Sequence, residues 1–321
     1  MKTPILLTAL TLLTFSSTSV QAQGPLANPG PPGPTMKSLD QIEARTAIPK
    51  SPVVPGAGPH FVISQPGSYY LTGNIEVTSG NGINITASNV TLDLNGFSLI
   101  SKTASPAGGS AISITGGMAG IEIKNGHITG GTARTPVGDS QWDATFTPAG
   151  WNDGVFGPFA KNVILTQLTT ERCGNFGIRL GKANISYTSA NGNGAGGIMT
   201  SGGAVITNAT ATENGGDGIN AYSGTVANVN SGNNMGSGIA AELGVVTNAT
   251  AVFNGSIGIK AGLGVVSNSR AQANFKAGIF VSLGVASHCV AYLNSTDPTT
   301  VDNEIFILPG GQRDACVPAL E

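Results

Sequence analysis

The sequence is poor in charge, in aromatic side chains and in cysteine. Only 10 % of its 321 residues are charged, only 6 % are aromatic, and the formal net charge is −2. Such a chain presents no basic surface that would attract phosphates, so we do not expect nucleic acid as a partner. The composition also argues against a disordered chain. Disordered chains are rich in charge and poor in hydrophobic residues, whereas 40 % of the residues here are hydrophobic.

The sequence also lacks an apolar run long enough to span a membrane. The run at residues 4–15 has about 12 residues, against the roughly 20 that a membrane-spanning helix needs. It follows Lys2 and is followed by Val20 and Ala22 at the −3 and −1 positions of a cleavage site. This arrangement is typical of a secretory signal peptide over residues 1–22. We therefore expect cleavage near Ala22 and a secreted, periplasmic or cell-surface protein.

The three cysteines are too far apart in sequence for a zinc site, and we expect neither a metal nor a cofactor. Export permits disulfides. Cys289 and Cys316 both lie near the C-terminus, so a bridge that closes the tail is one alternative, and two free thiols are the other. Cys173 has no partner in either case.

The first part of the mature chain divides by composition into a linker and a cap. Residues 23–35 are rich in Pro and Gly and predict an extended linker. Residues 36–60 are expected to cap the first coil of the domain that follows. Within them, residues 38–45 begin with a Ser and place Leu39 and Ile42 at helical spacing, which predicts one short helix.

Glycine is abundant, with 47 residues, and from residue 61 it separates short β-prone runs. Over the second half of the chain a Gly-Ile pair recurs at a nearly constant interval, at 177–178, 197–198, 218–219, 238–239, 258–259 and 278–279. An asparagine stands four positions before each glycine from the second pair on, at Asn193, Asn214, Asn234, Asn254 and Asn274. A second column, with a constant step, consists of Asn208, Asn228, Asn248, Asn268 and then His288.

A repeat of this length and composition predicts a parallel β-helix. Each residue then stacks on its equivalent in the next coil at about 4.8 Å. The isoleucines are expected to face inward, and so are Leu243, Leu263 and Leu283. The asparagines are expected to occupy bends, where their amides can bond along the stack. We expect nine or ten coils over residues 61–294, and a C-terminal cap or tail at 295–321.

The coils, together with "PGSYYLTGNI" and "NVTLDLNGFSLIS" upstream, resemble bacterial right-handed parallel β-helix repeat proteins of the pectin-lyase-like superfamily. The resemblance covers roughly residues 36–295 and implies an all-β, single-stranded right-handed parallel β-helix. It implies polysaccharide as the partner, but it does not specify a reaction, because this superfamily mixes lyases, hydrolases, epimerases and members without known chemistry. The Asn-Thr-Asp, Asp-Asp and Gly-His-Gly signatures of polygalacturonases are absent, as are the lyase patterns Asp-His and Arg-x-Pro-x-x-Arg. Whether the protein is an enzyme stays open.

Residues 129–153 break the repeat and predict a loop that projects from the coils and carries both tryptophans. Loops on rigid scaffolds often carry binding residues, and tryptophan rings stack on sugars. The candidate substrate-binding residues in and beside this loop are His127, Arg134, Asp139, Trp142, Asp143, Trp151 and Asp153. The alternative is that the tryptophans fold back under the loop and the aspartates sit in turns. Exposed tryptophans over a groove would favour sugar binding, and buried ones would oppose it.

Two functions are compatible with the sequence. The first is a secreted monomer that binds or acts on polysaccharide. The second is a non-catalytic structural, surface or adhesion protein whose rigid coils present Thr, Ser and Asn.

Overall fold

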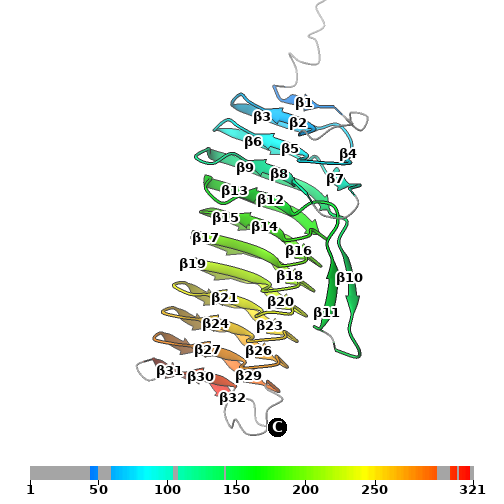
Figure 1. Ribbon diagram of the computed structural model, residues 1–321. Coiled ribbons are helices and arrows are strands. Elements are labelled where there is room, and N and C mark those ends of the chain that lie inside the picture. Colours follow the sequence, from blue (N-terminus) through cyan, green and yellow to red (C-terminus); the bar gives the residue numbers. More distant parts are fainter. Residues whose placement is uncertain are drawn as a thin grey trace, which may run out of the picture. The chain divides into compact units, whose positions relative to one another are not determined.

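The computed structural model describes residues 44–49, 59–103, 108–140, 142–294, 304–308 and 311–318. These residues form a parallel β-solenoid of about 11 turns with roughly 21 residues per turn (Figure 1). The β-helix prediction is confirmed, although nine or ten coils was an underestimate. The helix expected at 38–45 lies mostly outside the described residues, and Arg45 already leads into strand β1 (Thr46–Ile48). No helix in the described part of the chain is long and apolar enough to cross a membrane.

Each coil contributes one short strand to each of three parallel sheets, here called faces A, B and C. Face A contains β2 (Phe61–Ile63), β5 (Ile83–Ile85), β8 (Ser110–Ile114), β12 (Asp153–Gly157), β14 (Phe176–Leu180), the starts of β17 (Gly196–Thr207) and β19 (Ile219–Ala227), β21 (Ile239–Ala241), β24 (Ile259–Ala261), β27 (Ile279–Val281) and β30 (Ile305–Ile307).

Faces B and C complete each coil. Face B contains β1, β3 (Gly67–Leu71), β6 (Val90–Asp93), the starts of β9 (Ala119–Thr129) and β13 (Lys161–Glu171), β15 (Ala183–Ser186), the ends of β17 and β19, β22 (Val245–Thr247), β25 (Val265–Ser267), β28 (Val285–Ser287) and β31 (Gln312–Asp314). Face C contains β4 (Ile75–Val77), β7 (Ser98–Ser101), the ends of β9 and β13, β16 (Ser189–Asn191), β18 (Thr210–Thr212), β20 (Asn230–Gly232), β23 (Thr250–Val252), β26 (Arg270–Gln272), β29 (Val290–Tyr292) and β32 (Val317–Pro318).

The predicted isoleucine column forms the core wall of face A. Its members Ile178, Ile198, Ile219, Ile239, Ile259 and Ile279 pair in register and are at most 1 % exposed. Small side chains line the opposite wall on face C, at Ala190, Ala211, Ser231, Ala251, Ala271 and Ala291. Large residues on one wall and small ones on the other suit a narrow, closely packed interior.

The predicted inward stack of leucines is wrong. Leu243, Leu263 and Leu283 are 44 %, 58 % and 57 % exposed, in the turn between faces A and B. The inward positions near this turn belong instead to Ala241, Ala261 and Val281, which are buried. A turn position repeats with the same period as a core position, so the period alone did not distinguish the two.

The column that begins at Asn208 lies at the corner between faces B and C. Asn208, Asn228, Asn248, Asn268 and His288 are exposed there, with φ angles of 51, 55, 50, 48 and 52°. Asparagine tolerates this left-handed conformation better than most residues. The Asn248 amide donates to Oδ1 of Asn228 at 3.2 Å, and the backbone N–H of His288 donates to the carbonyl of Asp314. Backbone conformation is thus the main reason for asparagine at this corner.

The other asparagine column forms a buried ladder at the corner between faces C and A. The side-chain amide of each member donates to Oδ1 of the next at 2.8–2.9 Å, from Asn193 through Asn214, Asn234, Asn254 and Asn274 to Asn294. The ladder ends on a carboxylate, because Asn294 donates its backbone and side-chain N–H groups to the two oxygens of Glu304. The predicted asparagine ladder is confirmed for this column.

Candidate functional site

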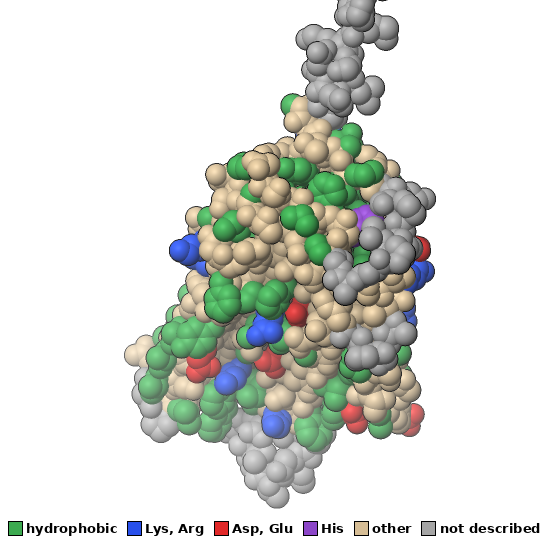
Figure 2. Space-filling view, turned by 45° about the horizontal axis from the view of Figure 1, so that its top comes forward, with side chains coloured by type: hydrophobic (Ala, Val, Ile, Leu, Met, Phe, Trp, Pro, Cys, Tyr) green, Lys and Arg blue, Asp and Glu red, His purple; other side chains and the backbone are tan. Residues whose placement is uncertain are grey.

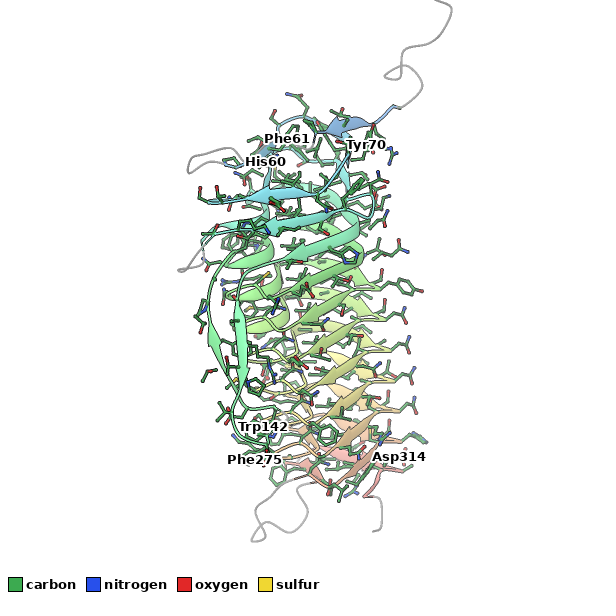
Figure 3. All side chains as sticks on the ribbon, turned by 90° about the vertical axis from the view of Figure 1, so that its right-hand side faces the viewer. His60, Phe61, Tyr70, Trp142, Phe275 and Asp314 are labelled. Atoms are coloured by element: carbon green, nitrogen blue, oxygen red, sulfur yellow. The ribbon has the colours of Figure 1, made fainter. Side chains whose placement is uncertain are left out.

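Residues 129–153 form an antiparallel hairpin, β10 (Ala133–Pro136) with β11 (Ala144–Thr147), rather than an irregular loop. The hairpin is inserted between β9 on face C and β12 on face A. It runs along the stacked turns of the following coils, as Figures 1 and 3 show, so it does not project away from them. We call residues 130–150 the strap. At its base, the backbone N–H of Thr132 donates to the carbonyl of Arg172 at 2.9 Å.

The strap is held along its length by side chains that contact successive turns. Arg134 forms an ion pair with Glu213 (3.8 Å). Near the tip, Trp142 packs on Phe275 with ring centroids 5.0 Å apart (Figure 3). A Cβ atom at Gly255 would lie only 2.7 Å from the Trp142 ring, so the bare backbone of this glycine makes room for the indole. Trp142 is half-buried and serves as an anchor of the strap.

The second tryptophan belongs to the core. Trp151 is 0 % exposed, and its indole N–H donates to the carbonyl of Gly80 at 3.3 Å. A fully buried ring has no face on which a sugar could stack, so this predicted binding residue instead fills the interior where the strap rejoins the coils. Trp142 thus contacts a turn of a later coil, whereas Trp151 is enclosed at the base of the strap.

The structure separates the predicted binding residues instead of gathering them. Asp139 and Asp143 lie near the strap tip with Trp142, whereas Asp153 lies at its base. Six register steps lead from Val155, beside Asp153, to Ile279, beside Phe275. At about 4.8 Å per coil the two groups are roughly 29 Å apart. His127 is exposed on face C, in register with Ser98 and Thr169, and belongs to neither group.

Asp153 is a buried hydrogen-bond acceptor for the next coil. Its Oδ1 accepts the backbone N–H of Phe176 (3.1 Å) and the side-chain amide of Asn175 (3.2 Å). Burial raises the pKa of this carboxyl, while the Phe176 N–H, the charge of Arg179 and the Asn175 amide oppose that rise. Asp217 is at the equivalent position three coils further on and accepts the N–H of Ser237 at 2.8 Å. The recurrence indicates a structural role for both carboxylates.

A group that the sequence did not reveal lies on face A, next to the base of the strap. The guanidinium of Arg179 lies over the ring of Phe156 (5.7 Å to its centroid) and over that of Phe176 (5.6 Å). All three side chains are partly exposed. Phe156 and Arg179 are register partners on adjacent coils, yet their spacing in sequence exceeds the regular period, so the period does not pair them. We call these three residues the Arg179 cluster.

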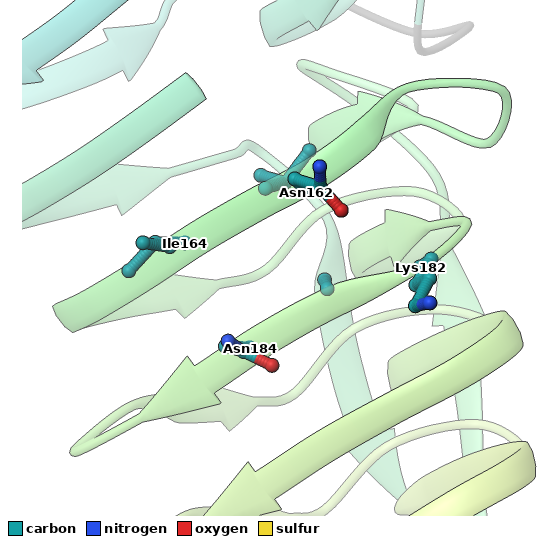
Figure 4. Close-up of a pocket in the computed structure, with 6 residues that line it drawn as sticks. Asn162, Ile164, Lys182 and Asn184 are labelled. Atoms are coloured by element: carbon teal, nitrogen blue, oxygen red, sulfur yellow. The ribbon is translucent and has the colours of Figure 1, made fainter. Parts of the chain in front are cut away.

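Face B carries a shallow hollow of about 200 Å³ (Figure 4). Its lining includes the amides of Asn162 and Asn184, the side chain of Lys182 and the exposed side chain of Ile164. The described residues that line it include no carboxylate. Among all residues that the structure describes, no three His, Cys, Asp or Glu side chains come close enough together to hold a metal ion. Charged side chains are also sparse on the face shown in Figure 2.

Comparison of the sequence with family models and with curated proteins gives no match. Among solved structures, the chain is similar to a double mutant of the periplasmic alginate epimerase AlgG, with 13 % identity, a TM-score of 0.53 and 84 % of each chain covered. It is also similar to the mannuronan C-5 epimerase AlgE6 A-module of Azotobacter vinelandii, with 12 % identity, a TM-score of 0.49, and 79 % of this chain and 92 % of that chain covered. At 13 % identity, the likeness to AlgG concerns the β-helix fold alone.

Proposed function

We propose that the protein is an exported β-helix protein that binds polysaccharide on face A, at the Arg179 cluster. The observation that carries the proposal is the placement of a guanidinium over two partly exposed phenylalanine rings on the surface of a rigid sheet. Because the three side chains stand on the stacked strands β12 and β14, their spacing is set by the coil rather than by a mobile loop.

The chemistry of the cluster suits a sugar polymer. Aromatic rings offer flat apolar surface to the C–H faces of sugars. The planar guanidinium can bind a carboxylate or sulfate with two parallel hydrogen bonds, and its contact with the rings limits the rotamer freedom that binding would otherwise cost. Acidic polymers are therefore expected to bind better than neutral ones, with an affinity that falls as salt is added.

Two further points support this assignment. The N-terminal sequence predicts export, which would place the protein where polysaccharides occur. The epimerase AlgG, whose fold is similar, acts on alginate according to its name. The proposal is one of binding and assigns no reaction, because Asp153, the carboxylate beside the cluster, is already held by two hydrogen bonds.

The test compares two arginine variants that differ in location. Arg179→Gln removes the charge of the cluster, and Arg270→Gln removes a guanidinium that also lies over a ring, that of Tyr292, but on face C. Purified wild-type protein and both variants would be screened on arrayed glycans and on acidic and neutral polymers, with assays for new reducing or unsaturated ends. We expect Arg179→Gln to weaken binding about tenfold or more and Arg270→Gln to leave it unchanged. Equal loss in both variants, or no binding by the wild type, would contradict the proposal.

A second candidate function, a surface or adhesion protein without catalysis, is favoured by an apolar strip on face B and its edge. The strip consists of Val245, Val265, Leu243, Leu263 and Leu283, which are between 37 % and 58 % exposed. Contiguous apolar surface of this kind often marks an interaction site. If Leu263→Ser abolishes adhesion to a surface while glycan binding persists, the strip rather than the Arg179 cluster carries that function.

A further inference from the structure

The last coil of the solenoid consists of three short strands. Strands β30, β31 and β32 pair with β27, β28 and β29 of the coil before them. Cys289 immediately precedes β29, and Cys316 immediately precedes β32, while the residues that follow them, Val290 and Val317, are register partners. The two cysteines therefore occupy the same column in adjacent coils.

Both thiols are buried at this position and lie close together. Cys289 is 0 % exposed and Cys316 is 8 % exposed. The backbone N–H of Cys289 donates to Sγ of Cys316 at 3.3 Å. Equivalent residues of adjacent coils are about 4.8 Å apart, which falls inside the Cα–Cα range of roughly 4.4–6.8 Å found in disulfides. Bond formation would thus need side-chain rotation and little movement of the backbone.

We propose that Cys289 and Cys316, which are free thiols in this structure, form a disulfide in the exported protein. The bond would tie the last coil to the regular stack at the corner between faces B and C. It would complement Glu304, which binds the end of the asparagine ladder at the corner between faces C and A. The last coil needs such a tie because it packs on a neighbouring coil on one side only.

The oxidation needs a disulfide donor, such as oxidised glutathione or a dithiol oxidase outside the cytoplasm. One cysteine thiolate attacks the donor and releases one donor thiol, and the second thiolate then displaces the other donor half. The two cysteines lose two protons and two electrons, and the donor is reduced to two thiols. Burial raises the pKa of the Cys289 thiol, so its thiolate is scarce in the folded protein, and we expect the bond to form mainly during folding.

Peptide mapping tests the bond directly. The full chain would be exported or refolded with oxidised glutathione, its free thiols blocked, and the protein digested with trypsin without reductant. Trypsin cleaves after Lys276 and Arg313, so the bond would join peptide 277–313 to peptide 314–321, and a reductant would separate them. Cys173 is in peptide 173–179 and is expected to carry the blocking group.

Two variants serve as controls. Cys173→Ser is expected to keep the joined peptides, and Cys316→Ser is expected to lose them. Blocked, unjoined peptides from the wild type after both export and oxidative refolding would overturn the proposal, and so would a bond between Cys173 and either of the other cysteines. The wild-type map decides the question even where Cys316→Ser fails to fold, and it is independent of glycan binding.

Discussion

Asparagine occupies two corners of the coils that contain Asn208, Asn228, Asn248 and Asn268, for different physical reasons. At the corner between faces B and C its backbone adopts the left-handed conformation and its side chain is exposed, as at Asn228. At the corner between faces C and A its side chain is buried and bonds to the coils on either side, as at Asn234. The residue before the buried asparagine, for example Asn233 with φ 56°, takes the left-handed conformation there. One residue type with one period thus serves two roles.

The buried ladder predicts a large loss of stability on substitution. Asn234→Ala removes the acceptor of the Asn214 side chain and backbone N–H groups and the donor to Oδ1 of Asn254. Leaving buried polar groups without partners costs about 1–3 kcal/mol each, so we expect the free energy of unfolding to fall by several kcal/mol. Urea unfolding measures the change. Asn230→Ala, at an exposed position of the same coil, is the control and should change it by less than about 0.5 kcal/mol.

Asp153 predicts a pH dependence of stability with a definite sign. Its folded-state pKa is raised above 3.8, chiefly by burial. The stability that this group contributes is therefore fully present below its unfolded pKa and is lost as the pH rises through the folded pKa. Asp153→Asn keeps an oxygen that can accept the Phe176 N–H and removes the charge. We expect the variant to gain stability over the wild type at neutral pH and to lose that gain at about pH 3.

Urea unfolding at several pH values would measure this difference. Asp139→Asn, at an exposed position near the strap tip, controls for the change in net charge. A gain from Asp153→Asn that is the same at acidic and neutral pH would show that packing, rather than ionisation, separates the two proteins.

At the scale of elements, the strap is a two-stranded hairpin that depends on the coils for its order. An isolated hairpin is marginally stable in water, so its contacts with the turns decide its conformation. Those contacts include the Arg134–Glu213 ion pair, the Phe146 ring beside Gly215, and the Trp142–Phe275 packing near the tip. Because Glu213 is half-exposed, its ion pair contributes little, and the aromatic contact is the stronger anchor.

Trp142→Ala is therefore expected to release the strap without unfolding the coils. Hydrogen exchange of residues 133–147 should become faster, while the global free energy of unfolding changes by about 1 kcal/mol or less. Phe275→Ala should have the same effect. In the free energy of opening of the strap, measured by hydrogen exchange, the double variant should show a coupling between the two residues of roughly 0.5–1.5 kcal/mol. Phe159→Ala, at a side chain that is 75 % exposed, is the control. Unchanged exchange in the strap would mean that its other contacts, such as the Arg134–Glu213 ion pair, hold it without the aromatic pair.

Much of the fold was predictable because its columns repeat in sequence, but the site was not. The Gly-Ile period predicted the isoleucine core, and the asparagines at Asn214 and beyond predicted the ladder. The inward orientation of Leu263 was predicted wrongly because solvent-facing turns share the same period. The Arg179 cluster was not predicted because the spacing of Phe156 and Arg179 exceeds the regular period, and the separation of Trp142 from Trp151 depends on the strap, an insertion that interrupts the period. Sequence neighbours within such an insertion can lie many coils apart.

At the scale of the whole solenoid, each coil contacts mainly its two neighbours, so stability is approximately a sum over coils and their interfaces. The register supports this view, because Ile239, Ile259 and Ile279 follow one another without a shift, as do Val245, Val265 and Val285. A coil in this region is thus a removable unit, provided that the length of the deleted segment preserves the columns.

Deletion of residues 239–258 removes one complete period and joins Gly238 to Ile259, which keeps every column in place. We expect this protein to fold with an unchanged circular dichroism spectrum of the β type and a modestly lower free energy of unfolding. Deletion of 239–257 is the comparison variant, because it leaves Gly258 as one extra residue and makes that coil as long as the natural step from Ile198 to Ile219. It should also fold, with a lower free energy of unfolding than the deletion of the complete period, as measured by circular dichroism and urea unfolding.

The deletion of the complete period also tests whether the strap is matched in length to the coils beneath it. Removing one coil brings Phe275 closer to the strap base by about 4.8 Å, so Trp142 at the tip no longer meets it. Hydrogen exchange in residues 133–147 should therefore rise in the folded deletion variant as it does in Trp142→Ala. If the strap stays protected, it can slide along the stacked turns, and its position is then set by the general surface of the turns rather than by one aromatic partner.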